Sequence, residues 1–89
     1  MPNTKAENSL LATITLTGEV LYGTPKEIVT ALRETAKINF ETNENFMKQW
    51  SDRARFFSKA VVDFSTEEAF IGTNIEAGFI KIIEGEYIQ

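Results

Sequence analysis

The sequence predicts a single α+β domain, in which a small antiparallel sheet packs against two amphipathic helices and a short third helix. Apolar residues alternate with threonine near the N-terminus, two later segments carry apolar residues at helical spacing, and an apolar run follows Gly78. The 89 residues suffice for one compact core. We therefore expect residues 1–9 to form a flexible tail and residues 10–89 to form one domain.

The first part of the sheet is predicted over residues 10–22, which read LLATITLTGEVLY. Apolar side chains alternate with threonine over residues 12–17, the pattern of a half-buried strand whose apolar side chains face the core. Gly18 then interrupts the alternation. It is either a bulge in one long bent strand, which we favour, or part of a tight turn into a second hairpin arm at residues 19–22.

The strongest local signal in the chain is the sequence TPKE, which begins at Thr24. Thr24 can accept hydrogen bonds from first-turn amides, Pro25 suits the first helical position, and Glu27 can close a capping box. Apolar residues follow at helical spacing: Ile28, Val29, Leu32 and Ala36. These features predict a helix over about residues 25–38 that stops near Asn39.

A second helix is predicted over about residues 43–59, capped by Thr42 or Asn43. Its apolar stripe occupies about a third of the circumference and contains Phe46, Met47, Trp50, Ala54, Phe57 and Val61. Residues 60–64 are either a last helical turn or a short strand. We expect the sheet to be covered by five side chains from the two helices: Ile28, Leu32, Phe46, Trp50 and Phe57.

The last third of the chain has two interpretations. Ser65 to Glu68 has the Ser-x-x-Glu form of another capping box, which favours a helix over residues 66–77 that ends at Gly78. Gly72 disfavours a helix, and the alternative is a hairpin that turns there. We favour the helix, followed by a strand over residues 78–83 and a turn before Tyr87.

Several kinds of chemistry are excluded by composition. Cysteine and histidine are absent, which removes disulfides, thiolate zinc sites, cysteine nucleophiles and histidine bases. The adjacent acids Glu67 and Glu68 suit the first turn of a helix, and no acids have the spacing of a calcium loop. We therefore expect no catalytic residue, no cofactor and no metal site, and we predict that the protein is not an enzyme.

The charge balance is acidic, with nine Lys and Arg against thirteen Asp and Glu, a net charge of −4. A negative chain is repelled by bulk nucleic acid and by anionic membrane surfaces. No apolar run approaches the roughly 18 residues of a membrane span. These features predict a soluble cytoplasmic protein that does not act at a membrane.

Two features indicate a protein partner, whose identity the sequence does not give. Phe56 lies beside Arg53, about 80° from the edge of the buried stripe of the second helix, and a semi-exposed aromatic next to an arginine is typical of interface anchors. The alternative, which we favour for Phe56 itself, is that a second core face covers it. The other feature is an acidic region near the C-terminus that contains Glu67, Glu68 and Glu76.

The leading hypothesis is a non-catalytic protein-binding module, an accessory, regulatory or inhibitor protein of bacterial, phage or mobile-element origin. One form of this hypothesis is a small acidic inhibitor that occupies a basic, nucleic-acid-binding surface on its target. A homo-oligomeric structural protein, joined through Phe56 or an exposed sheet edge, is an alternative from another class.

A nucleic-acid-binding regulator is the remaining alternative, and it is disfavoured by charge. It would use the basic residues Lys48, Arg55 and Lys59 of the second helix. The C-terminal pattern of a helix, a strand and a Glu-Gly turn resembles a winged helix, which implies a recognition helix followed by a wing. The candidate recognition helix, however, carries acids and no Lys or Arg over residues 66–77, so phosphates would repel it.

Overall fold

The computed structural model describes residues 11–84. The elements follow in the order β1 (Leu11–Thr15), β2 (Val20–Gly23), α1 (Pro25–Thr35), α2 (Asn43–Ser58), α3 (Glu67–Ala77) and β3 (Ile80–Glu84). The strands form one antiparallel sheet in the order β2-β1-β3. The predicted α+β class is therefore confirmed, and so is the helix over the last third of the chain. The expected tail and the turn before Tyr87 lie outside the described residues.

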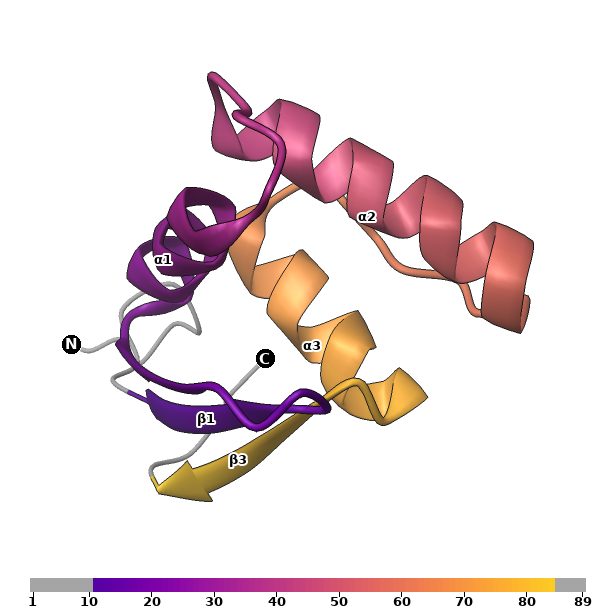
Figure 1. Ribbon diagram of the computed structural model, residues 1–89. Helices are drawn as coiled ribbons and strands as arrows, with labels where there is room; N and C mark the ends of the chain where they lie inside the picture. Colours follow the sequence, from indigo (N-terminus) through magenta and orange to yellow (C-terminus); the bar gives the residue numbers. More distant parts are fainter. Residues whose placement is uncertain (1–10, 85–89) are drawn as a thin grey trace, which may run out of the picture.

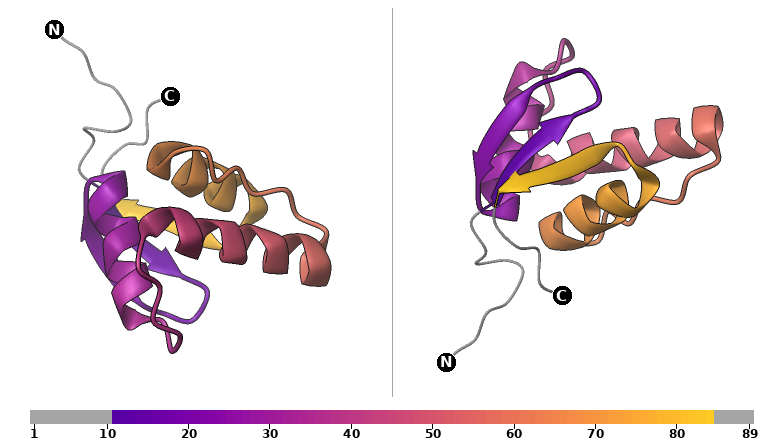
Figure 2. Two further views of the ribbon diagram at one scale, coloured as in Figure 1. Left: turned by 90° about the horizontal axis from the view of Figure 1, so that it is seen from above. Right: turned by 90° about the horizontal axis from the view of Figure 1, so that it is seen from below.

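The helices are stacked on one face of the sheet in two layers (Figure 1). α1 and α3 lie next to the strands, and α2 lies across them on the side away from the sheet. Figure 2 shows that the outer end of α2 extends beyond the sheet. Among residues 11–84, none of the helices has the length and hydropathy needed to cross a lipid bilayer.

Gly18 belongs to a hairpin turn, so the expectation of one bent strand is wrong. β1 and β2 pair directly, with Ile14 opposite Val20. The turn is closed by hydrogen bonds to Thr15: its N–H donates to the Glu19 carbonyl at 3.0 Å, and its carbonyl accepts from the N–H of Gly18 at 2.9 Å. Gly18 has φ 90°, a left-handed conformation that glycine adopts without the cost of a Cβ atom.

The alternating residues of β1 face the opposite way from the prediction. Thr13 is fully buried and pairs with Leu21 and Ile82, which pack against the core. Directly opposed residues share a face of an antiparallel sheet, so Thr13 faces the helices. Its hydroxyl donates to the Leu21 carbonyl at 3.3 Å, which satisfies the buried oxygen. The apolar Leu16 instead lies exposed in the turn.

The other face of the sheet leaves two apolar side chains of β2 in solvent. Val20 is 60% exposed and Tyr22 is 65% exposed. Tyr22 pairs with Ala12 of β1, so these residues share the face that looks away from the helices.

The capping box that begins α1 is confirmed. The Glu27 N–H donates to Oγ1 of Thr24 at 3.3 Å, and the Thr24 N–H donates to Oε1 of Glu27 at 2.9 Å. The C-terminal boundary is earlier than predicted, because α1 ends at Thr35 and Ala36 already has an extended backbone. Asn39 therefore does not stop the helix.

The other two helices begin at threonine caps and end in left-handed residues. Thr42 accepts from the Asn45 N–H at the start of α2, and Lys59 ends that helix with φ 56°. α3 begins after Thr66, not at a capping box on Ser65, and it ends at Gly78 with φ 86°. A left-handed residue is a common helix stop.

The core lies between the sheet and the helices. Five of its largest fully buried apolar side chains are Phe70, Ile28, Ile71, Ile80 and Val29. α2 contributes Phe46, Met47 and Ala54. Two residues predicted for the apolar stripe of α2 are exposed instead, because Phe57 is 71% exposed and Val61 lies beyond the helix end.

Residues 60–64 form neither a helical turn nor a strand. This connection runs back from the outer end of α2 towards α3, and Val62 is buried in the core. Oγ of Ser51, on α2, donates to the Val62 carbonyl at 2.7 Å. The Asp63 N–H donates to Oγ1 of Thr73, on α3, at 3.0 Å. These two bonds hold the connection against both helices.

A candidate protein-docking groove along the second helix

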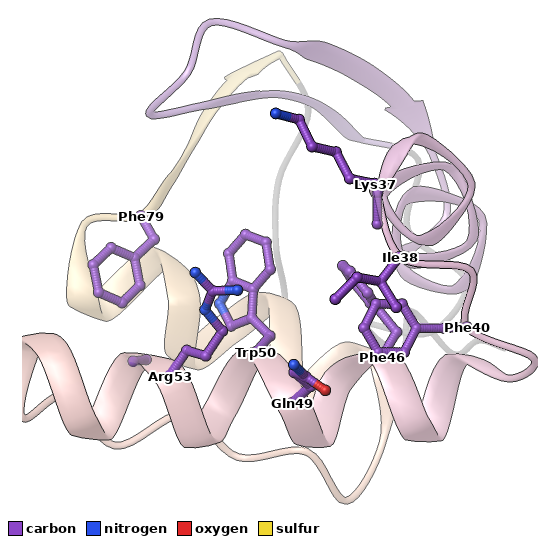
Figure 3. A pocket seen from close by; sticks show the side chains of 10 residues that line it. Lys37, Ile38, Phe40, Phe46, Gln49, Trp50, Arg53 and Phe79 are labelled. Carbon is purple, nitrogen blue, oxygen red and sulfur yellow. The ribbon is translucent and has the colours of Figure 1, made fainter.

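An open groove of about 650 Å³ lies between α2, the α1–α2 connection and the residue that precedes β3 (Figure 3). The connection and the C-cap of α1 contribute Ala36, Lys37, Ile38 and Phe40; α2 contributes Phe46, Gln49, Trp50, Arg53 and Ala54; and Phe79 completes the lining. Most of these side chains are apolar, and four are aromatic. The groove therefore has the composition of a site that binds apolar groups.

The spacing of residues on α2 explains why one helix serves both the core and the groove. Met47, Ser51 and Ala54 form the face that is buried in the domain. A second stripe recurs at intervals of three or four residues and consists of Phe46, Trp50, Arg53 and Phe57. α2 lies in the outer layer, so the neighbouring elements bury the first stripe, with Ala54 at the border of the groove, and cover the second stripe only towards its N-terminal end.

Trp50 forms a rigid part of the groove floor. Its indole N–H donates to Oδ1 of Asn74 at 2.7 Å. Its ring packs edge-on against Phe70, with centroids 5.5 Å apart, and lies 5.8 Å from the ring of Phe46. These contacts hold the indole against α3, while part of it stays exposed to the groove.

The facing wall is held by a network around Arg33 of α1. Its Nε donates to Oδ1 of Asn43 at 2.8 Å, and its Nη1 donates to the Phe40 carbonyl at 2.8 Å. The Asn43 amide in turn donates to Oγ1 of Thr30 and to Oε2 of Glu67, at 3.0 and 3.2 Å. These bonds tie Phe40 of the connection to α1, and the first residue of α2 to both α1 and α3, so contacts within the domain hold this wall in place.

Two cations flank the apolar lining from different elements. Lys37 extends from the α1 side, and Arg53 projects from α2 beside Trp50 and Phe79 (Figure 3). Among residues 11–84, no carboxylate forms an ion pair with Lys37 or Arg53. The Arg53 guanidinium lies 6.0 Å from the centre of the Phe57 ring, within the range of a cation–π contact. The groove is thus positively charged at its edges.

Beyond Arg53, α2 ends in a pair of exposed aromatic rings. Phe56 is 78% exposed and Phe57 is 71% exposed, and their rings meet edge to face with centroids 4.9 Å apart. The interpretation of Phe56 as a covered core residue is therefore wrong. We call the exposed side chains of Phe56 and Phe57 the aromatic end of α2.

The predicted acidic residues are not part of this site. Glu67 and Glu68 lie in the first turn of α3, whereas Glu76 lies in its last turn. Glu67 is half-buried and accepts a hydrogen bond from Asn43, so it has a structural contact within the domain. None of the three lines the groove. Arg53 and Phe56 instead both lie against the Phe57 ring on α2, apart from these acids.

The predicted basic residues occupy the opposite side of α2. Lys48, Arg55 and Lys59 are all exposed and recur close to one stripe. Asp52 interrupts this stripe and pairs with Lys48, with Nζ and Oδ2 3.4 Å apart. The stripe thus has mixed charge and is separate from the groove.

Phe57 is the main site residue that sequence reasoning placed wrongly. Its position on the apolar stripe predicts burial, and only the position of α2 in the outer layer leaves it exposed.

In the part of the chain that the structure describes, no side chains gather as metal ligands would. No family model, curated protein or solved structure matches the chain.

Proposed function

We propose that the protein is a non-catalytic protein-binding module, which docks its partner along the groove and the aromatic end of α2. The observation that carries this proposal is the exposure of Phe56 and Phe57 next to a preformed apolar groove. Single exposed apolar residues are ordinary, but contiguous ones that adjoin a groove mark interaction sites. Aromatic residues and arginine are also the residue types enriched where protein partners bind tightly.

The lining of the groove supports binding more than chemistry. Its polar side chains are Lys37, Gln49 and Arg53. This set offers hydrogen-bond donors and charge, but it places no base beside a nucleophile, which is one common arrangement for covalent catalysis. The proposal therefore relies on α2 and no longer on Glu67, Glu68 or Glu76.

The test is site-specific photo-cross-linking in the cells that produce the protein. A photoreactive amino acid at Gln49, which is exposed in the groove, is compared with the same group at the adjacent Lys48, which lies on the charged side. We expect one discrete protein adduct from position 49 and little from position 48. Equal labelling from both positions, or labelling from neither, would contradict the proposal.

A further inference from the structure

The groove has a chemistry that restricts what can occupy it. We infer that the occupant is an amphipathic helix of a partner protein, whose apolar side chains fill the groove and whose flanking carboxylates pair with Lys37 and Arg53. This inference rests on the proposed function and names the kind of segment that the site takes.

The backbone around the groove favours a helix over an extended peptide. An added strand gains affinity from free main-chain groups at a sheet edge. None of the lining residues belongs to a strand. Phe79, which precedes β3, already donates its N–H to Asn74 of α3 and accepts at its carbonyl from Leu16, so the groove presents no free sheet edge. A helix forms its backbone hydrogen bonds internally, so it can bind through an apolar surface alone.

The shape and extent of the site favour a macromolecular segment. The volume of about 650 Å³ is in the range of small-molecule pockets, roughly 300–1,000 Å³. Such pockets enclose most of their ligand, however, whereas this groove is open along α2. Beyond the groove lining, the exposed Phe57 ring lies next to Arg53, with the guanidinium 6.0 Å from the ring centre. A helix laid along α2 would cover both the groove and the aromatic end.

Charge selects an acidic partner and disfavours a second copy of this chain. Lys37 and Arg53 face the site without a carboxylate partner among residues 11–84. In a two-fold dimer, both subunits would present this same surface. Two grooves facing each other would bring these four cations close together, which costs free energy at an interface. An apolar helix with Glu or Asp at its flanks would instead pair its carboxylates with Lys37 and Arg53.

The experiment uses two synthetic helical peptides that lack tryptophan. One has a leucine stripe flanked by glutamate, and the other has lysine at the same flanking positions. Binding is followed by the emission of Trp50, the single tryptophan, which lines the groove. We expect the glutamate peptide to bind about tenfold more tightly than the lysine peptide, because opposite charges stabilise the contact and like charges oppose it.

Charge-reversal variants locate the contact. Arg53→Glu is expected to weaken binding of the glutamate peptide about tenfold and to reverse the preference between the peptides. Arg55→Glu is the matched control, because it makes the same change on the charged side of α2. It should change the affinity by less than about twofold. Lys37→Glu provides a second variant should Arg53→Glu alter the circular dichroism spectrum.

This inference is overturned by equal affinity for both peptides, by equal effects of Arg53→Glu and Arg55→Glu, or by displacement of the peptide by a small apolar anion, sodium laurate, at a lower concentration than the peptide itself requires. The inference would also be overturned if sedimentation gave the mass of a dimer that the peptide does not dissociate, because a second copy of this chain would then occupy the groove. The proposed function fails separately, through the absence of a Gln49 cross-link. A Gln49 adduct on a basic or extended segment would preserve that function and reject the acidic helix.

Discussion

The indole of Trp50 and the side-chain amide of Asn74 join α2 to α3. Trp50 Nε1 donates to Asn74 Oδ1 at 2.7 Å, and Asn74 Nδ2 donates to the Phe70 carbonyl at 2.8 Å. Asn74 is fully buried, so these bonds satisfy an amide that has no access to water. Because the same indole also lines the groove, the packing of the domain positions a residue of the groove.

Replacing the indole with a ring that lacks the N–H tests this link. Trp50→Phe leaves Oδ1 of Asn74 without its donor, and a buried unsatisfied polar atom costs about 1–3 kcal/mol. We expect the free energy of unfolding to fall by that amount in urea denaturation followed by circular dichroism. A loss below about 0.5 kcal/mol would show that the bond does not stabilise the domain.

Ser51 provides a second test of how α2 is held. Its hydroxyl is buried and donates to the Val62 carbonyl at 2.7 Å. Ser51→Ala removes the donor of that carbonyl, and we expect a loss of about 1–3 kcal/mol in the free energy of unfolding. Ser58→Ala, at the exposed end of the same helix, should cost less than about 0.5 kcal/mol. Equal effects would contradict the role given to Ser51.

The helices were predictable because their start and stop signals are local. Thr24 and Glu27 form the capping box that their spacing predicts, and Gly78 ends α3 in the left-handed conformation expected of it. The hairpin was harder to predict from the sequence, because Gly18 is compatible with both a bulge and a turn. The choice depends on whether β1 and β3 leave an edge for β2 to pair with, which local sequence does not specify.

The burial of individual side chains and the formation of the groove depend on long-range packing. Thr13 is buried because its hydroxyl finds a partner across the strand, and Phe57 is exposed because α2 lies in the outer layer. Periodicity alone predicts the opposite for both. Phe56 and Arg53 were recognisable as a pair, since their spacing on one helix is local. The groove itself was not, because residues far apart in sequence, such as Lys37 and Phe79, line it together.

Gly23 occupies a position where a side chain would disturb both the backbone and the capping box. It has φ 140°, and a Cβ atom would lie 2.6 Å from Oε1 and 2.9 Å from Cβ of Glu27. Gly78→Ala is the matched comparison, because Gly78 also has a positive φ but open space around it. We expect Gly78→Ala to cost about 1–2 kcal/mol and Gly23→Ala to cost more, measured by urea denaturation. The reverse order would contradict the close contact with Glu27.

Asp63 should give the stability of the domain a weak dependence on acidity. Hydrogen bonds from the side chain and the backbone N–H of Ser65 hold the pKa of Asp63 below its usual value. A lowered pKa means that the native state favours the ionised form. The contribution is therefore present above the ordinary Asp value of about 3.9 and is lost as pH falls through the lower native value.

The comparison of wild type with Asp63→Asn isolates this contribution, since asparagine resembles the protonated carboxyl group. We expect the wild type to be the more stable at about pH 6, and the difference to shrink as the pH falls below the ordinary Asp value of about 3.9. The effect should be small because Asp63 is exposed. A difference that stays constant over this range would show that the carboxylate charge is not involved.

The aromatic end of α2 can be distinguished from the core by its energetics. Phe57→Leu removes ring atoms that are mostly in water already, so we expect a change below about 0.5 kcal/mol in the free energy of unfolding. Phe70→Leu makes the same change at a fully buried position and should cost about 1–3 kcal/mol, because it leaves a cavity. A comparable loss for both variants would mean that Phe57 is packed in the isolated protein, and would remove the surface on which docking depends.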